Sequence, residues 1–220
     1  MDNLLISAFY PAIVGTADPD SGLGFIERYG GLVRPLRYTE RDGDGNAYPI
    51  AYPVSCLIAD SCTDPSIYKG LTPDDRYKSV AYFERRGAGS IEFGKPAQHD
   101  MTFRLPLRFV AWLNYKKLGV EGCPSTLAYM MAFIKALRNQ NMTASDDTLT
   151  NPARVLVKSF ELPEQRADII FAAYSYAAKE WAFMPPYGFF AVDLVAELTT
   201  SIYCFTEPAV PAEIDCITTF

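Results

Sequence analysis

The sequence is short of the residues and motifs on which many enzyme and metal sites depend. Its 220 residues include a single histidine, His99, and two tryptophans. One histidine excludes zinc sites with two histidine ligands and histidine-rich metal clusters. The chain also has no P-loop, no complete GxGxxG motif and no GxSxG motif, which are signatures of nucleotide binding and of serine hydrolases. We therefore expect no cofactor and no bound metal.

Cysteines and long apolar runs are also scarce, and this scarcity indicates in which cellular compartment the protein is made. The five cysteines are odd in number and never spaced as CxxC: Cys56, Cys62, Cys123, Cys204 and Cys216. We interpret them as reduced and mostly buried thiols. Asp2 stands where a secretory signal carries basic residues, Pro11 interrupts the apolar run, and no run reaches about 18 apolar residues. We therefore expect a protein made in a cytoplasm and no membrane partner.

The rest is an ordinary globular composition with unevenly placed charge. Hydrophobic residues make up 49% and charged residues 21% of the chain, and the net charge is −6. A chain of this length buries roughly 70% of its unfolded surface, which is enough for a core without metals or disulfides. Residues 161–220 hold nine acidic and two basic residues, a net −7, whereas residues 1–160 carry a net +1. We expect this acidic third to be a solvated face that disfavours specific nucleic-acid binding.

The pattern of apolar residues predicts a sheet. A turn at 41–46, rich in Asp, Gly and Asn, separates strands over 32–39 and 47–56, which predicts a hairpin. Pro49 and Pro53 on the second strand predict an edge position, because proline has no ladder donor. Further strands are predicted over 78–85, 90–93, 101–114, 153–161 and 187–205.

Two helices are predicted between these strands. Residues 125–138 carry apolar residues at spacings of three and four, after Ser125 or Thr126 as a cap. A second helix opens at Pro163 and is best supported over 171–183. Residues 2–14 fit a helix or a strand.

This order of elements predicts an α+β fold. We expect a single mixed or antiparallel sheet with two helices packed on one face, together with an extended hairpin. Because no second composition regime is visible, we expect one domain over 1–220. Residues 15–24, 60–77 and 206–220 are predicted to be loops or extended segments.

Three loop motifs have both a functional and a structural interpretation. Asp42-Gly43-Asp44-Gly45-Asn46 resembles the start of an EF-hand loop, and Gly22-x-Gly24 and Gly87-x-Gly89 resemble phosphate-binding glycine pairs. The residues that break these motifs are Ala47 and Pro53 in the calcium pattern and Glu27 and Glu92 at the third glycine of the phosphate pattern. We interpret all three as turns.

Several titratable residues are weaker candidates for a site. The acid pairs Glu84/Glu92 and Asp193/Glu197 would suit general acid–base work, and the second pair shares one face of its strand. His99 adjoins Asp100 but has no nucleophile in a known motif. The last candidate is the Cys123 thiol, whose pKa a nearby helix N-terminus would lower. For each of these, a solvated or packed structural role is the alternative interpretation.

Two stretches of the chain resemble virion proteins. Tyr77–Glu84 (YKSVAYFE) and Leu107–Leu118 (LRFVAWLNYKKL) look like segments of proteins encoded among the virion genes of tailed phages and prophages. The segment Trp181–Pro186 (WAFMPP), followed by a strand over Tyr187–Ile202, is similar to the closing helix and strand of tail-terminator and neck proteins. The N-terminal hairpin and the loop at 60–77 depart from a minimal terminator.

This resemblance implies a structural subunit with no catalytic residue. Such subunits form oligomeric rings at the head–tail junction or the tail end, so the partners implied are other copies of the chain and portal, connector or tail-tube proteins. DNA would pass through the ring lumen without specific binding, and the protein would end in the virion after synthesis in the host cytoplasm. Tyr and Phe are also enriched at subunit interfaces, and the chain has 14 of each. The alternatives are a small cytosolic enzyme that uses Asp193, Glu197 or His99, and a monomeric binding module.

Overall fold

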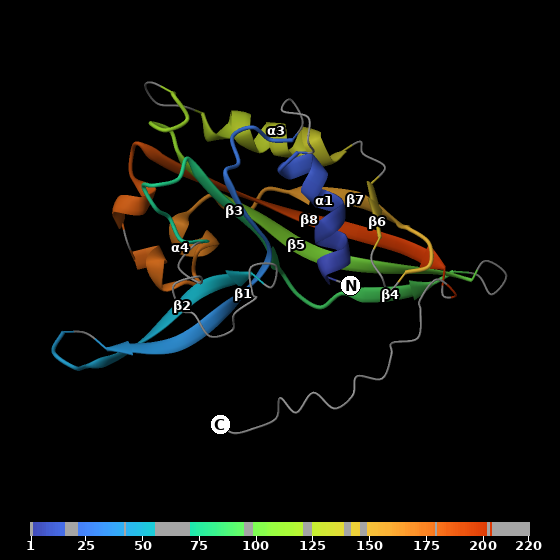
Figure 1. Cartoon of the computed structure of the whole chain (residues 1–220), viewed down its shortest axis with the longest axis horizontal. Coiled ribbons are helices and arrows are strands. Elements are labelled where there is room, and N and C mark those ends of the chain that lie inside the picture. The colour runs from blue at the N-terminus through green and yellow to red at the C-terminus, as the bar shows by residue number, and fades with distance from the viewer. Residues whose placement is uncertain are drawn as a thin grey trace.

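The chain folds around one eight-stranded mixed sheet (Figure 1). The computed structural model describes residues 2–15, 22–41, 43–55, 71–94, 99–120, 125–138, 142–145, 149–178, 180–201 and 203. The strands are β1 (Arg28–Arg41), β2 (Ala47–Ser55), β3 (Ser79–Arg85), β4 (Ser90–Phe93), β5 (Asp100–Asn114), β6 (Met142–Ala144), β7 (Ala153–Glu161) and β8 (Tyr187–Ser201). The helices are α1 (Asp2–Ile13), α3 (Thr126–Arg138) and α4 (Ala167–Ile170), with 3-10 turns η2 (Ser175–Ala178) and η3 (Glu180–Phe183).

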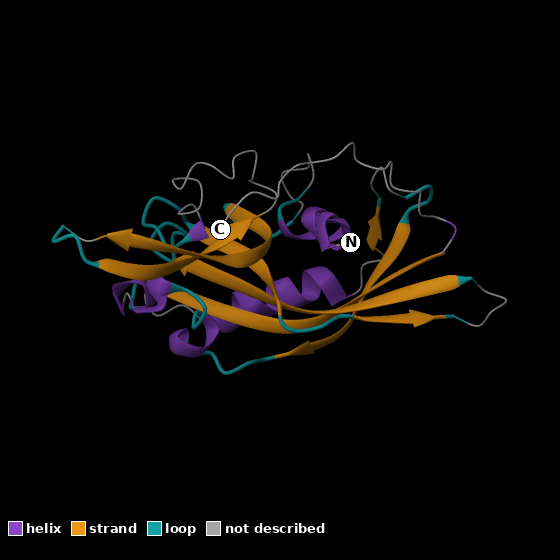
Figure 2. Cartoon of the chain, turned by 90° about the horizontal axis from the view of Figure 1, so that it is seen from below, coloured by secondary structure: helices purple, strands orange, loops and turns teal. Residues whose placement is uncertain are grey.

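The sheet has two long central strands and shorter strands on either side. Its order is β2-β1-β3-β5-β8-β7-β6, and β4 lies beside β5 beyond the end of β3. β5 and β8 are 15 residues each, pair along their whole length and run through the molecule (Figure 1). Figure 2 shows the long strands of this sheet from a second side. The β1–β3 pair is parallel and all other pairs are antiparallel. The predicted α+β class with a mixed sheet is therefore confirmed.

The strand predictions agree with the structure in most places. The hairpin is β1–β2, and β2 lies at an edge of the sheet as its prolines indicate. β8 ends at Ser201, whereas the prediction ran to Phe205, and Tyr203 lies in a 3-10 turn. β6 is not among the predicted strands, because it has only three residues and lies in a polar segment.

One face of the sheet, here the α1/α3 face, is covered by two helices. Phe9 of α1 and Phe133 of α3 pack on Phe83, Phe109 and Phe190 of the sheet, and all five side chains are buried. The rings of Phe109 and Phe133 stack with centroids 3.9 Å apart. Two helices on one face were expected, and α3 is one of them. The other is α1, formed by the segment that periodicity left undecided.

The opposite face, here the α4 face, is covered by a compact irregular segment. The helix predicted to open at Pro163, with its best support over 171–183, is wrong. Instead, α4, η2 and η3 divide residues 167–183 into short helical turns. Phe171, Tyr174 and Tyr176 are all buried against the sheet. Tyr174 and Tyr176 are two residues apart, and one face of an α-helix cannot present both. Trp112 of β5 fixes the segment by donating its indole N–H to the Ala182 carbonyl at 2.6 Å.

The predicted loops are described only in part. Residues 16–21, 56–70 and 204–220 lie outside the described residues, so the segments expected at 15–24 and 60–77 are tested only in part and the segment expected at 206–220 is not tested. At 71–77 the chain forms turns, and Leu71 is buried against the α4-face core. Among the described residues, no helix is long and apolar enough to cross a membrane.

Candidate functional site

The predicted acid pair lies in a row of ion pairs on the α4 face. Asp193 and Glu197 do share a face of β8, as the alternation predicts, and each acid meets cations from neighbouring strands. Asp193 accepts from Arg108 Nε at 2.6 Å and Nη2 at 2.7 Å. Glu197 accepts from Arg104 Nε at 2.6 Å and lies 3.0 Å from Lys158 Nζ.

These ion pairs decide the charge state of Glu197. Burial by itself raises the pKa of the Glu197 carboxyl, but hydrogen bonds and charge from Arg104 and Lys158 outweigh burial, so the pKa is lowered. Arg104 also pairs with Glu92 of β4. A carboxylate held ionised between two cations is suited to linking strands. It carries no proton at neutral pH, so it cannot act there as a general acid.

A second acid on the same face behaves in the opposite way. Glu84 of β3 lies opposite Arg108, and burial raises the pKa of its carboxyl, partly offset by a hydrogen bond to Tyr174 and by the charge of Arg108. Beside it, the Tyr82 and Tyr176 hydroxyls are 2.7 Å apart, and burial raises both of their pKa values. Within the described part of the chain, Glu84 Oε1 and Arg108 Nη1 are buried without a hydrogen-bond partner.

The remaining titratable candidates are not brought together. Glu84 lies opposite Arg108 and Glu92 opposite Thr102 of β5, so the two acids are about 20 Å apart at 3.3 Å per residue. His99 is exposed beside Tyr203, whose hydroxyl is 3.5 Å from Nδ1, at the far end of β8 from Asp193. Cys123 lies outside the described residues.

The loop motifs are accounted for by turns where the structure describes them. Residues 43–46 form the exposed turn of the β1–β2 hairpin, and Asp42 lies outside the described residues. Gly22 has a φ of +79°, and a Cβ there would lie 2.4 Å from the Gly15 nitrogen. Gly89 lies against β5, where a Cβ would be 2.9 Å from the Arg104 carbonyl oxygen. Among the described residues, no three His, Cys, Asp or Glu side chains gather in a way that could hold a metal ion.

The feature that stands out is an open edge at the start of β8. β7 pairs with β8 only from Asp193 to Thr199, so the stretch Tyr187–Phe190 has no described strand on that side. The Tyr115 N–H donates to the Pro186 carbonyl at 3.0 Å, so the even-numbered residues of this stretch bond to β5. The backbone N–H and C=O of Phe189 therefore point away from β5, toward the open side.

A glutamine side chain takes the place of the missing strand at the next odd position. Gln165 Nε2 donates to the Ala191 carbonyl at 2.9 Å, and Gln165 Oε1 accepts from the Ala191 N–H at 2.9 Å. The two bonds satisfy both backbone groups of Ala191. The available backbone on this edge is thereby limited to the vicinity of Phe189.

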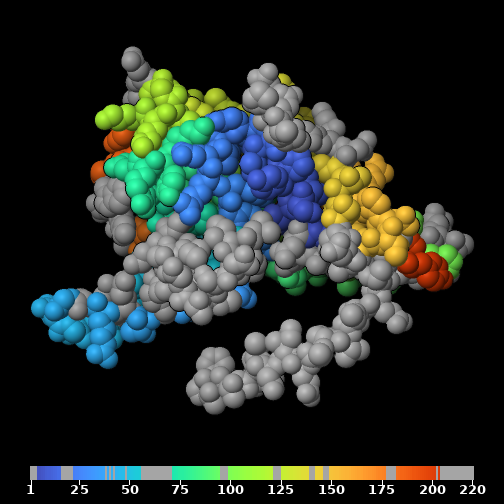
Figure 3. All heavy atoms as spheres, viewed as in Figure 1, coloured from blue at the N-terminus to red at the C-terminus, as the bar shows by residue number. Residues whose placement is uncertain are grey.

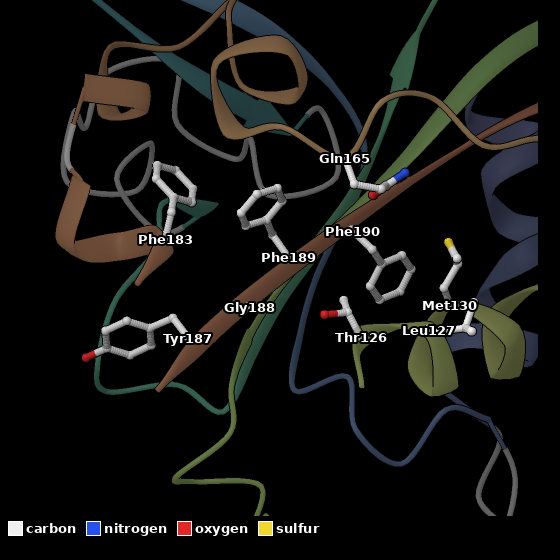
Figure 4. Close-up of a pocket in the computed structure, with 9 residues that line it drawn as sticks. All are labelled: Thr126, Leu127, Met130, Gln165, Phe183, Tyr187, Gly188, Phe189 and Phe190. Carbon is white, nitrogen blue, oxygen red and sulfur yellow. The ribbon is translucent and has the colours of Figure 1, made fainter. Parts of the chain in front are cut away.

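A largely apolar pocket of about 400 Å³ lies along this open edge. Figure 4 shows Phe183 and Phe189 on one side of β8 and Thr126, Leu127, Met130 and Phe190 on the other. The α3 side chains come near β8 because Gly188 has no side chain: the Tyr115 ring lies where a Cβ would be, and its hydroxyl is 2.9 Å from Thr126 Oγ1. A groove of about 430 Å³ follows farther along α3, lined by Met131 and Ile134 among others.

Exposed apolar side chains gather in the segments that border this pocket. Leu127 is 55% exposed and Met131 is 51% exposed, both on α3. Leu162 before α4, Ile169 within it and Met184 after it are also exposed. Exposed apolar surface beside a pocket is typical of a protein–protein contact.

A second open edge lies at the other end of the sheet. β4 pairs only with β5 among the described residues, and its four side chains are all exposed, with Ile91 at 54% and Phe93 at 73%. The Gly94 N–H donates to the Asp100 carbonyl at 2.7 Å, so the even-numbered residues of β4 bond to β5. The backbone groups of Ile91 and Phe93 then face outward.

The third exposed feature is an arm formed by the β1–β2 hairpin. β1 leaves β3 after Val33 and from there pairs only with β2 among the described residues. The base of the arm is fixed by Ile50 and Tyr52, buried in the α4-face core, and by the Ala51 N–H, which donates to Ser175 Oγ at 2.8 Å. From Arg37 to Pro49 all the described side chains are exposed, and this part of the arm projects from the body (Figure 3).

Comparison with known proteins gives no further constraint on the function. No model of a known protein family matches the chain, and no curated protein matches it.

Sequence reasoning missed the pocket and the open edge of β8. The predicted strand lengths contained an indication of the open edge, because the strand predicted from residue 187 is much longer than the strand predicted over 153–161. The role of Gln165 had no signal, since its partner Ala191 is 26 residues away.

Proposed function

We propose that this chain is a structural subunit of a phage-like particle that assembles into a ring at the head–tail junction or the tail end. The observation that carries the proposal is the β1–β2 arm. A two-stranded hairpin alone in water is marginally stable at best, so an arm with its outer part exposed is suited to lie against a neighbour. Two resemblances add to it: that of Leu107–Leu118 to proteins encoded among phage virion genes, and that of the closing segment Trp181–Ile202 to neck and tail-terminator proteins.

The sheet edges and the charges are consistent with this role. β4 and the start of β8 are open edges with exposed apolar side chains nearby, and sheet edges are favourable sites for joining chains. In the acidic third of the chain, Asp193 and Glu197 are ion-paired with arginines, which supports a cross-linking role for these acids. The ring partners would be other copies and neighbouring portal, connector or tail-tube proteins.

The proposal is tested by the mass and shape of the purified full-length chain in solution. We expect a closed ring with a fixed number of subunits, measured by native mass spectrometry and seen by negative-stain electron microscopy. A monomer that persists at all concentrations up to hundreds of micromolar overturns the proposal and favours the enzyme or the monomeric binding module.

A charge reversal on the arm makes the test specific. Arg37 is exposed on the arm, and Arg37→Glu should weaken assembly at least tenfold. Lys116→Glu, an equal charge change at an exposed position after β5, is the matched control and should leave assembly unchanged. Equal effects of the two variants would show that net charge, and not the arm, controls assembly.

A further inference from the structure

The two open strand edges are complementary, and we infer that β4 of one copy adds to the start of β8 in the next copy. This inference rests on the proposed role as an assembling subunit and names the surfaces that would join. A strand added to a sheet edge gains affinity from backbone hydrogen bonds and specificity from side-chain pockets. The occupant of the pocket beside β8 is then a second copy of this chain.

The backbone groups at the two edges match. Phe189 on β8 and Ile91 on β4 each present an N–H and a C=O outward, with no described partner. In an antiparallel pair, two such residues placed opposite each other exchange two hydrogen bonds. With Ile91 opposite Phe189, Phe93 lies beside Tyr187, and Ala191, already capped by Gln165, lies beyond the end of β4.

The side chains match as well. β4 carries two large apolar side chains, Ile91 and Phe93, that are more than half exposed in the isolated chain. With Ile91 opposite Phe189, the side chains of Ile91 and Phe93 would enter the side of the 400 Å³ pocket that Phe183 and Phe189 line (Figure 4). A buried Phe side chain removes about 150–250 Å² from water, so docking β4 here would cover Phe93, the most exposed apolar residue among the described side chains of the sheet.

The positions of the two edges make each contact head-to-tail. Ile91 lies opposite Phe103 of β5, which lies opposite Leu198 of β8, so nine residues of β8 separate the two edges along the strand. That is about 30 Å at 3.3 Å per residue, and the edges face opposite sides of the sheet. The β4 surface and the β8 surface are different, so each contact is head-to-tail, and repeated head-to-tail contacts form a ring when the rotation closes.

The test blocks each surface separately in the full-length chain. Ile91→Lys with Phe93→Lys changes only exposed side chains and blocks β4. Leu127→Asp blocks the β8 edge, because Leu127 lies on the α3 side of β8, where Glu92 of the incoming β4 would lie, and the new acid repels that carboxylate. An acid in the first turn of α3 suits the helix dipole, so the variant should fold. Val14→Lys, an exposed apolar residue at the end of α1, is the control.

The expected masses follow from the geometry. Each blocked variant alone should be monomeric by native mass spectrometry, whereas Val14→Lys should assemble like the wild type. An equimolar mixture of the two blocked variants retains one intact β4 and one intact β8 edge that can meet, so it should form a one-to-one dimer and nothing larger. A blocked variant that keeps the wild-type mass, or a mixture without dimer, overturns the inference and leaves the ring proposal standing.

If the wild type is monomeric, the ring proposal fails and a peptide decides the inference. A labelled peptide with the sequence of residues 89–94 (GSIEFG), capped at both ends, should bind the wild-type chain saturably and the Leu127→Asp variant at least tenfold more weakly. Absence of saturable binding, measured by fluorescence anisotropy, overturns the inference.

Discussion

The two ends of β8 show two ways of completing a strand. From Asp193 to Thr199 the strand has β5 on one side and β7 on the other, and Asp193 and Glu197 bind cations from both neighbours. From Tyr187 to Phe190 only β5 pairs with it, and individual side chains replace the second neighbour. The closed end therefore depends on ion pairs between strands, and the open end depends on Gly188, Tyr115 and Gln165.

The largest effect is expected at the closed end, from the loss of Arg108. Arg108 is 3% exposed and donates two hydrogen bonds to Asp193. Glu84, whose carboxyl pKa is raised by burial, lies opposite Arg108 on β3. Arg108→Met would leave these acids without their buried cation, which typically costs about 3–5 kcal/mol of unfolding free energy. Urea unfolding measures the change.

Arg104→Met on the same strand is the matched control. The Arg104 side chain is 43% exposed, and its buried partner Glu197 keeps Lys158 as a second cation, so removing Arg104 should cost about 1–2 kcal/mol, less than removing Arg108. Equal costs for the two variants would contradict the assignment of Arg108 as the buried cation of the closed end.

The next largest loss of stability is expected at the open end, from a side chain added at Gly188. Gly188→Ala places a Cβ 2.2 Å from the Tyr115 hydroxyl oxygen and 2.6 Å from two ring atoms, so the ring must move. Overpacking of this kind costs about 1–3 kcal/mol, measured by thermal or urea unfolding. Gly24→Ala, where no atom lies within 4 Å of the new Cβ, should change the stability by less than about 0.5 kcal/mol.

Two acids of the α4 face should respond to pH with opposite signs. Folding raises the pKa of Glu84, so its contribution is present below its unfolded value near 4.5 and is lost as pH rises through the folded pKa. Folding lowers the pKa of Glu197, so its contribution is present above 4.5 and is lost as pH falls through the folded pKa.

Glutamine variants separate the two acids. Glu197→Gln should destabilise the protein by about 1–3 kcal/mol at pH 7, and the loss should shrink toward pH 3, because a neutral amide gives up two charge-assisted contacts. Glu84→Gln should gain stability relative to the wild type as pH rises from 4 to 7. The measurement is urea unfolding across this range, and parallel pH curves for the two variants would refute the opposite assignments.

Much of the sheet could be predicted from local pattern. The Asp-Gly turn located the β1–β2 hairpin, its prolines located an edge strand, and alternation placed Asp193 and Glu197 on one face. We expected the acidic third of the chain to be a solvated face, yet Glu197 is buried, because Arg104 and Lys158 reach it from strands distant in sequence.

Irregular structure could not be predicted in the same way. The segment 171–183 has apolar residues in numbers that suit a helix, but Tyr82 and Trp112 on the sheet determine which of its groups must reach inward. The open edge of β8 depends on where β7 ends, and a length difference between two predicted strands indicates it only after the strand order is known. Pairing order is a property of the whole sheet, which local periodicity does not encode.

The smallest effect belongs to Gln165, and it is local. Gln165→Ala removes both hydrogen bonds to Ala191 and should cost about 1–2 kcal/mol, since the site is partly exposed. Hydrogen exchange of the Ala191 amide should accelerate at least tenfold, while amides in the closed end of β8 keep their protection. Gln165→Glu keeps an acceptor for the Ala191 N–H but has no donor for the carbonyl, so its Ala191 amide should stay more protected than in Gln165→Ala. If Ala191 exchanges equally slowly in all three proteins, something other than Gln165 closes this part of the edge, and the available backbone is not restricted to Phe189.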